Sequence, residues 1–146
     1  MNLHSFSLIA ALIGLGTLAV AHTGVQNPAV LARMESMKAT QDSTKVLGDM
    51  AKGARGFDAA LARAAAAEIA RHASETPDLF SARETDPMTE ALPVIWEDFE
   101  DFTRKSQELE SVASALAMSL ETEADLREGL RLIGASCKSC HERYRK

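Results

Sequence analysis

The clearest pattern of apolar and polar positions lies between residues 93 and 120. Steps of four and three separate its apolar or small residues, which are Ile95, Phe99, Phe102, Ser106, Leu109, Ala113, Leu116 and Leu120. Such steps place side chains on one face of an α-helix. The pattern therefore predicts a long helix over this range, with one face buried in a core.

Three further helices are predicted from their ends as well as from their composition. One covers residues 28–52, because proline is tolerated in a first helical turn and glycine follows the last residue. Another covers residues 58–73 and begins with an aspartate that can act as its N-cap. The last extends from residue 122 nearly to residue 146, where Thr122 and Asp125 can form a capping box.

The longest irregular connection is predicted for residues 74–92, which are rich in proline, serine, threonine and aspartate. We expect it to hold a short helical turn at most. No segment after Pro28 alternates apolar and polar residues long enough to indicate a strand. The predicted fold is therefore all-α, an up-down-up-down antiparallel four-helix bundle.

The N-terminus carries an apolar run of uncharged residues, 8–21, that ends in Ala19-Val20-Ala21. A run this short followed by small residues indicates a signal peptide over residues 1–21, leaving a single domain of residues 22–146. Export would place the protein in the periplasm. Because no lysine or arginine precedes the run, an uncleaved membrane anchor remains the alternative, although roughly 20 apolar residues are needed to span a bilayer.

Charge and length restrict the classes of function. The chain has 146 residues, enough for one packed domain, and its 16 basic and 21 acidic residues give a net charge of -5. A nucleic-acid-binding protein usually carries a basic face, so this composition gives no support to that class.

The most specific motif lies near the C-terminus and reads Cys137-Lys138-Ser139-Cys140-His141. Spacings of three and four residues place the two thiols and the imidazole on one helical surface. The thiols can then add to the vinyl groups of a porphyrin while the imidazole approaches its iron. The motif predicts one covalently attached haem c per chain, with His141 as an iron ligand.

A cysteine pair with this spacing has two other interpretations. A redox-active disulfide of the thioredoxin type needs a βαβ context, which this helical sequence does not offer. A structural zinc site needs four ligands, and the remaining histidines lie far away in the sequence. Both interpretations are weaker than haem attachment.

With this motif at its C-terminal end, the sequence resembles the cytochrome c′ family of class II cytochromes c. Supporting resemblances lie in segments 45–53, 57–60 and 93–96. The resemblance implies a haem inside the bundle, with His141 as the proximal ligand and the first helix on the distal side. It also places Met37 at the position that faces the iron.

The residue facing the iron decides between two functions within this family. If Met37 ligates the iron, its thioether favours Fe(II) and the protein is a low-spin electron carrier that works with redox partner proteins. If Met37 only packs nearby, as methionines often do in cores, the iron is five-coordinate and binds nitric oxide or carbon monoxide. An enzyme such as a peroxidase is not expected, because no distal histidine with an acidic partner is evident.

Three further residues are candidate haem contacts, two of them from the resemblance and one from its position in the last predicted helix. Arg33 matches a family arginine near the haem propionates, and Trp96 matches an aromatic near the haem, with a plain core role as its alternative. Arg145 lies one turn after His141 and could tune the imidazole, pair with a propionate or act only as a cation at a helix C-terminus. A homodimer through the first two helices is also compatible with the resemblance.

Overall fold

The computed structural model describes residues 24–146 of the chain. The predicted signal peptide, residues 1–21, lies outside this range. Among the residues described, no helix combines the length and the apolar character that crossing a membrane requires.

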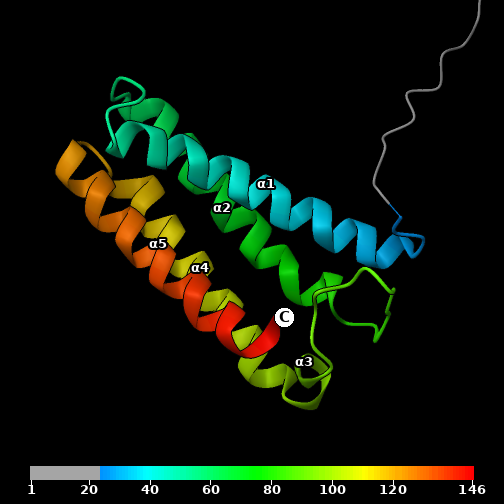
Figure 1. Ribbon diagram of the computed structural model, residues 1–146. Coiled ribbons are helices and arrows are strands. Elements are labelled where there is room, and N and C mark those ends of the chain that lie inside the picture. The colour runs from blue at the N-terminus through cyan, green and yellow to red at the C-terminus, as the bar shows by residue number, and fades with distance from the viewer. Residues whose placement is uncertain (1–23) are drawn as a thin grey trace, which may run out of the picture.

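Four long helices run alternately up and down and form the predicted bundle (Figure 1). They are α1 (Pro28–Ala51), α2 (Ala59–Leu79), α4 (Phe99–Ser119) and α5 (Glu123–Tyr144), and the one-turn helix α3 (Val94–Glu97) precedes α4. The all-α four-helix bundle predicted from the sequence is thereby confirmed.

Side chains cap three of the long helices at their N-termini and satisfy backbone N–H groups that have no partner within the helix. The side chain of Asn27 accepts hydrogen bonds from the first turn of α1, and Asp58 accepts one at the start of α2. Thr122 and Asp125 form the predicted capping box of α5. These caps explain why the helix starts could be predicted closely.

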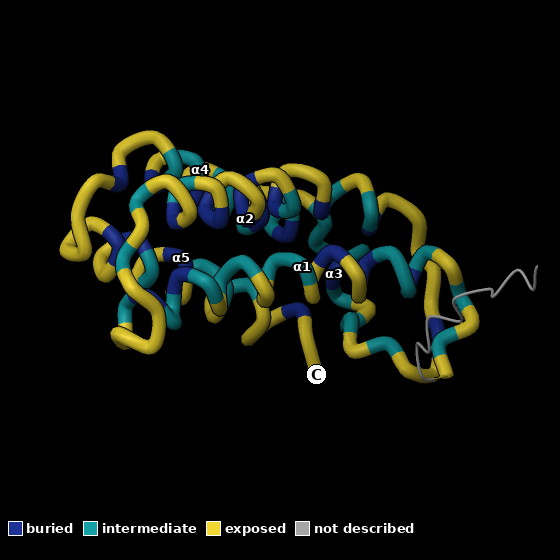
Figure 2. The backbone as a smooth tube through the Cα atoms, turned by 90° about the horizontal axis from the view of Figure 1, so that it is seen from above, coloured by how far each residue is buried: buried dark blue, intermediate teal, exposed yellow. Residues whose placement is uncertain are grey.

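The interior contains two clusters of buried side chains. Figure 2 marks the buried residues of the backbone in dark blue. The larger cluster joins α1, α2, α4 and α5, and small alanine side chains on α2 allow α4 to pack closely against it. α4 also approaches α5 closely, since a Cβ on Gly129 would lie 2.4 Å from a Leu116 methyl carbon. The smaller cluster is aromatic and includes Phe80, Phe102 and Tyr144.

Helix α2 is longer than predicted and ends at Leu79 rather than near residue 73. Pro77 lies in its last turn and lacks the N–H that would normally donate to the carbonyl of Ala73. The hydroxyl of Ser106 on α4 donates to that carbonyl instead, at 2.7 Å. The helix can therefore continue through the proline, and the irregular connection is correspondingly shorter.

The predicted helix over residues 93–120 is interrupted at Asp98, whose backbone (φ -135°, ψ 56°) leaves the helical region. The carboxylate of Asp98 pairs with Arg143 at 2.5 Å, and its carbonyl accepts a bond from the Tyr144 hydroxyl. These contacts hold the break against the end of α5. The expectation of one continuous helix was therefore wrong at this residue.

Candidate functional site

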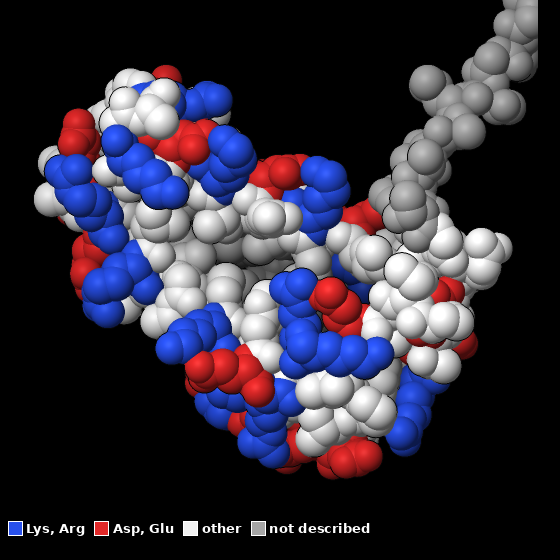
Figure 3. All heavy atoms as spheres, in the orientation of Figure 1, with Lys and Arg blue, Asp and Glu red and all other residues white. Residues whose placement is uncertain are grey.

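A cavity of about 1010 Å³ opens between α1 and the C-terminal half of α5. Figure 3 shows the surface hollowed there, with basic side chains along parts of its edge. Cofactor sites usually occupy roughly 300–1,000 Å³, so this cavity is large enough for an extended cofactor. Its apolar lining includes Val30, Ile95, Phe102, Leu109 and Leu130.

Helix α5 brings both cysteines of the motif to the cavity wall. Cys137 packs against the larger core cluster and Cys140 against the aromatic cluster, and neither forms a disulfide. Burial raises the pKa of the Cys137 thiol and raises the pKa of Cys140 to about 11. Before any haem is attached, both sulfurs are therefore protonated thiols at neutral pH.

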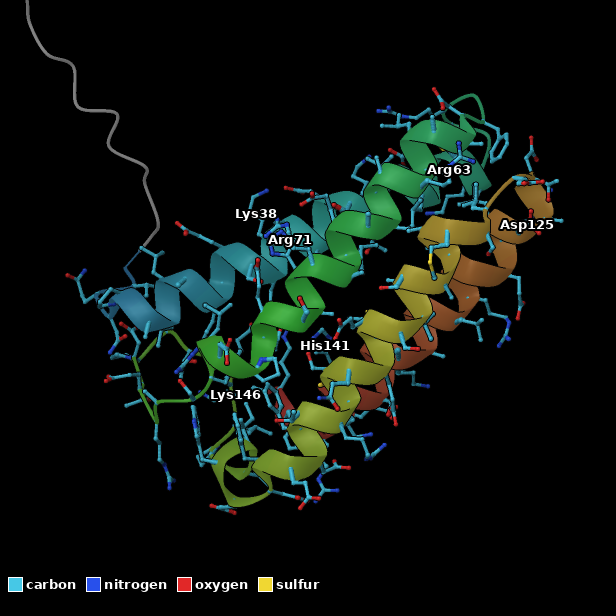
Figure 4. The ribbon with its side chains drawn as sticks, turned by 180° about the vertical axis from the view of Figure 1, so that it is seen from behind. Lys38, Arg63, Arg71, Asp125, His141 and Lys146 are labelled. Atoms are coloured by element: carbon cyan, nitrogen blue, oxygen red, sulfur yellow. The ribbon has the colours of Figure 1, made fainter. Side chains whose placement is uncertain are left out.

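His141 lines the same cavity, close to the C-terminal end of α5 (Figure 4). Partial burial lowers the pKa of its imidazole, and the positive charge of Arg145 lowers it further, whereas Glu90 acts in the opposite direction. A lowered pKa keeps the imidazole neutral at pH 7. A neutral imidazole has the free lone pair that iron ligation requires.

Helix α1 forms the facing wall and carries two methionines that line the cavity, Met34 and Met37. They are 43% and 37% exposed, so part of each side chain is accessible. A third methionine, Met88, also lines the cavity and is 54% exposed. Sequence analysis missed Met88, because it lies in an irregular connection without periodicity.

Arg33 is 3% exposed, and its guanidinium reaches both the cavity and the connection after α2. It donates to the carbonyls of Leu79, Ala82 and Glu84, at distances of 2.7–2.9 Å. It also lies over the ring of Phe80, 4.6 Å from the ring centre. In this structure Arg33 holds the backbone after α2 in place.

Trp96 and Arg145, the other two predicted haem contacts, occupy different surroundings. Trp96 is half-buried in the aromatic cluster, where its indole N–H donates to the carbonyl of Phe80 at 2.8 Å, and it is not among the residues lining the large cavity. Arg145 does line the cavity and pairs with Glu90 at 2.5 Å. Sequence analysis did not identify Glu90, whose partner is 55 residues away.

The side chains that line the cavity and could bind a cofactor indicate which cofactor fits. Two protonated thiols and one neutral imidazole face it from a single helix, across from thioether side chains on α1. Within residues 24–146, no group of three or more histidine, cysteine or acidic side chains is arranged to hold a metal ion directly. The residues present fit a haem that is attached through two thioethers and ligated by an imidazole.

A four-helix bundle whose last helix presents a Cys-x-x-Cys-His motif to an internal cavity defines a class II c-type cytochrome. Residues 28–145 match the family model described as Cytochrome C′. The chain belongs to the cytochrome c′ family. Its cofactor is covalently bound haem c, and it is a haem protein for electron transfer or gas binding.

Relatives from two subgroups resemble the chain. Cytochrome c-556 of Agrobacterium fabrum is 36% identical over 110 residues, which are 75% of each chain. Cytochrome c′ of Rhodopseudomonas palustris is 33% identical over 138 residues, which are 94% of each. A solved structure of cytochrome c′ from Rhodopseudomonas palustris superposes with a TM-score of 0.77 at 33% identity, covering 83% of this chain and 98% of that one.

Proposed function

We propose that this chain is a periplasmic electron carrier with one haem c. Cys137 and Cys140 form the thioether bonds, His141 is the proximal iron ligand and Met37 is the distal ligand. The observation that carries the proposal is the presence of Met37 in the wall of the cavity that also contains the thiols and imidazole of α5.

Attachment needs only the thiols of this chain and the vinyl groups of the porphyrin. Each sulfur forms a bond to one vinyl carbon while the thiol hydrogen passes to the other carbon, so no oxidant or reductant is consumed. When bound, the haem iron supplies one-electron chemistry. His141 and Met37 would hold that iron through an imidazole and a thioether, and a thioether ligand would favour Fe(II).

A five-coordinate cytochrome c′ that binds nitric oxide or carbon monoxide is the second candidate. The exposure of Met37 favours it, since a side chain that is 37% exposed can pack beside the iron and leave space for a gas. Relatives named cytochrome c′ and cytochrome c-556 both resemble the chain. In this alternative Met37 crowds the distal side without ligating.

The rest of the proposed role follows from the same assignment. Residues 1–21 act as a cleaved signal peptide, residues 22–146 form the exported domain, and other redox proteins are its partners.

Among the described residues that line the cavity, His141 is the single histidine, which suits electron transfer better than peroxidase chemistry. A homodimer through α1 and α2 would have to accommodate exposed ion pairs such as Lys38–Asp42.

Replacing Met37 with alanine is expected to convert the haem from low-spin to high-spin, because the distal thioether is lost. The reduced variant should then bind carbon monoxide, whereas the unaltered protein should not. Absorption spectra of both oxidation states, before and after carbon monoxide addition, measure the change.

Met34→Ala is the matched control, because Met34 lies on the same helix, lines the same cavity and has similar exposure. It should leave the spectrum low-spin. A spectrum of Met37→Ala that equals that of the unaltered protein would refute ligation by Met37. A high-spin spectrum only in Met34→Ala would assign the ligand to Met34.

A further inference from the structure

The two walls of the haem cavity belong to helices that make few direct contacts with each other. α1 packs mainly against α2, and α5 packs mainly against α4, so the distance between α1 and α5 depends on other parts of the chain. The connection of residues 80–92, called the strap below, contacts both helices. It lies near the N-terminus of α1 and the C-terminus of α5 (Figure 1).

The middle of the strap is bound to the residues that precede α1 through Asp86, which is 6% exposed. Its carboxylate accepts hydrogen bonds from the backbone N–H groups of Gln26 and Asn27, at 2.8 and 3.0 Å. A third bond comes from the N–H of Met88, at 2.9 Å, which shapes the strap itself. Because Asn27 is the N-cap of α1, Asp86 attaches the strap directly to the start of that helix.

Additional contacts attach the same region of the strap to α1. The side-chain amide of Asn27 donates to the carboxylate of Glu84 at 2.9 Å. The guanidinium of Arg33 donates to carbonyls on both sides of Phe80, as described above. The first two turns of α1 are thus attached to the strap by both backbone and side-chain groups.

The C-terminal end of the strap is bound to the residues that follow His141. Ala91 and Arg145 form an antiparallel β-bridge, in which the N–H of Leu92 donates to the carbonyl of Tyr144 at 2.9 Å. The N–H of Lys146 donates to the carbonyl of Glu90, also at 2.9 Å. The end of α5 is therefore attached to the strap a few residues after the proximal ligand.

From this arrangement we propose that Asp86 is a positioning residue for the haem, because the strap it anchors sets the separation between Met37 and His141. The inference rests on the proposed function in so far as Met37 is the distal ligand. Met37 lies ten residues after Asn27 on one continuous helix, about 15 Å along its axis. A rotation of α1 at its N-terminus is therefore transmitted to Met37.

Replacing Asp86 with alanine removes the acceptor for two N–H groups at the start of α1. In the holoprotein, the high-spin fraction of oxidised haem should rise about tenfold, within the range usual for coupling between two sites. Carbon monoxide should then bind to part of the reduced protein. Absorption spectroscopy and carbon monoxide titration measure both effects.

Asp125→Ala is the matched control. Asp125 accepts backbone hydrogen bonds from Glu121 and Thr122 at the start of α5, and thus caps a helix as Asp86 does. It lies outside the cavity lining and far from the strap in the sequence. Its loss should lower the unfolding temperature without altering the haem spectrum. Suppose that the unaltered protein is low-spin. An Asp86→Ala variant that is also low-spin and does not bind carbon monoxide would then overturn the proposal.

A distance measurement separates failure of this inference from failure of the proposed function. Nitroxide labels on Glu35→Cys in α1 and Ala135→Cys in α5, both exposed positions, report the helix separation in pulsed EPR of the reduced holoprotein. Asp86→Ala should shift or broaden the distance distribution by about 2 Å or more. The Asp125→Ala background should leave the distribution unchanged.

The haem spectrum tests ligation by Met37, and the label distances test the role of the strap. If the unaltered protein is already high-spin, ligation by Met37 fails, and the label distances alone decide whether Asp86 holds α1 and α5 together. Unchanged distances in Asp86→Ala would overturn the strap's role in either spin state.

Discussion

Replacing Cys137 and Cys140 together with alanine is expected to abolish covalent haem attachment completely. No other cysteine is present in the chain, so no thiol remains to add to a vinyl group. Mass spectrometry of the denatured, exported protein measures the outcome, since the unaltered chain should carry the mass of one haem and the double variant should carry none. Each single replacement should retain one thioether and therefore the full haem mass.

Ser139→Ala is the control for this prediction. Ser139 lies between the two cysteines and is exposed, and its hydroxyl accepts a hydrogen bond from Lys105. Its replacement changes the motif without removing a thiol, so haem attachment should be retained. A double cysteine variant that still carries haem after denaturation would contradict the assignment of both attachment sites.

Replacing Arg33 with alanine is expected to lower the free energy of unfolding by about 3 kcal/mol. Three part-buried backbone carbonyls lose a charged donor, and one hydrogen bond to a charged group contributes about 1.5–3 kcal/mol; the loss is partly offset because water can reach these carbonyls and a buried charge is removed. Arg33→Lys should recover less than half of the loss, because an ammonium group does not have the planar fork that reaches three carbonyls. Denaturant unfolding of the holoprotein measures the difference.

Arg63 offers a matched comparison, because its guanidinium donates to a single backbone carbonyl, that of Leu120, at 2.8 Å. Arg63→Ala should cost only about 1 kcal/mol, the usual contribution of one hydrogen bond. Equal losses in the two variants would show that the carbonyl contacts of Arg33 contribute no more than the single contact of Arg63.

Features encoded in neighbouring residues could be predicted from the sequence. The caps at Asp58 and Thr122 act on N–H groups within three residues, and the long apolar stripe of residues 93–120 has helical periodicity. The haem motif is equally local, since Cys137, Cys140 and His141 lie within two turns of one helix. Local physical chemistry therefore predicts the four long helices, apart from the break at Asp98, and the placement of the motif residues on one helix.

Features that depend on distant partners could not be predicted. Helix α2 continues past Pro77, where Ser106 supplies the missing donor, and that serine lies 33 residues away from the carbonyl it contacts. Asp86 finds its partners about 60 residues earlier, and Glu90 finds Arg145 55 residues later. Neither acidic residue belongs to a periodic pattern or a motif, so the strap became evident only from the structure.

The most direct test of the account is the absorption spectrum of the purified, exported protein in its oxidised and reduced forms, followed by addition of carbon monoxide. Ligation by His141 and Met37 predicts sharp α and β bands on reduction, a methionine-to-iron charge-transfer band in the oxidised form, and no response to carbon monoxide. A broad high-spin spectrum that shifts at once with carbon monoxide would contradict the electron-carrier assignment and identify a gas-binding cytochrome c′.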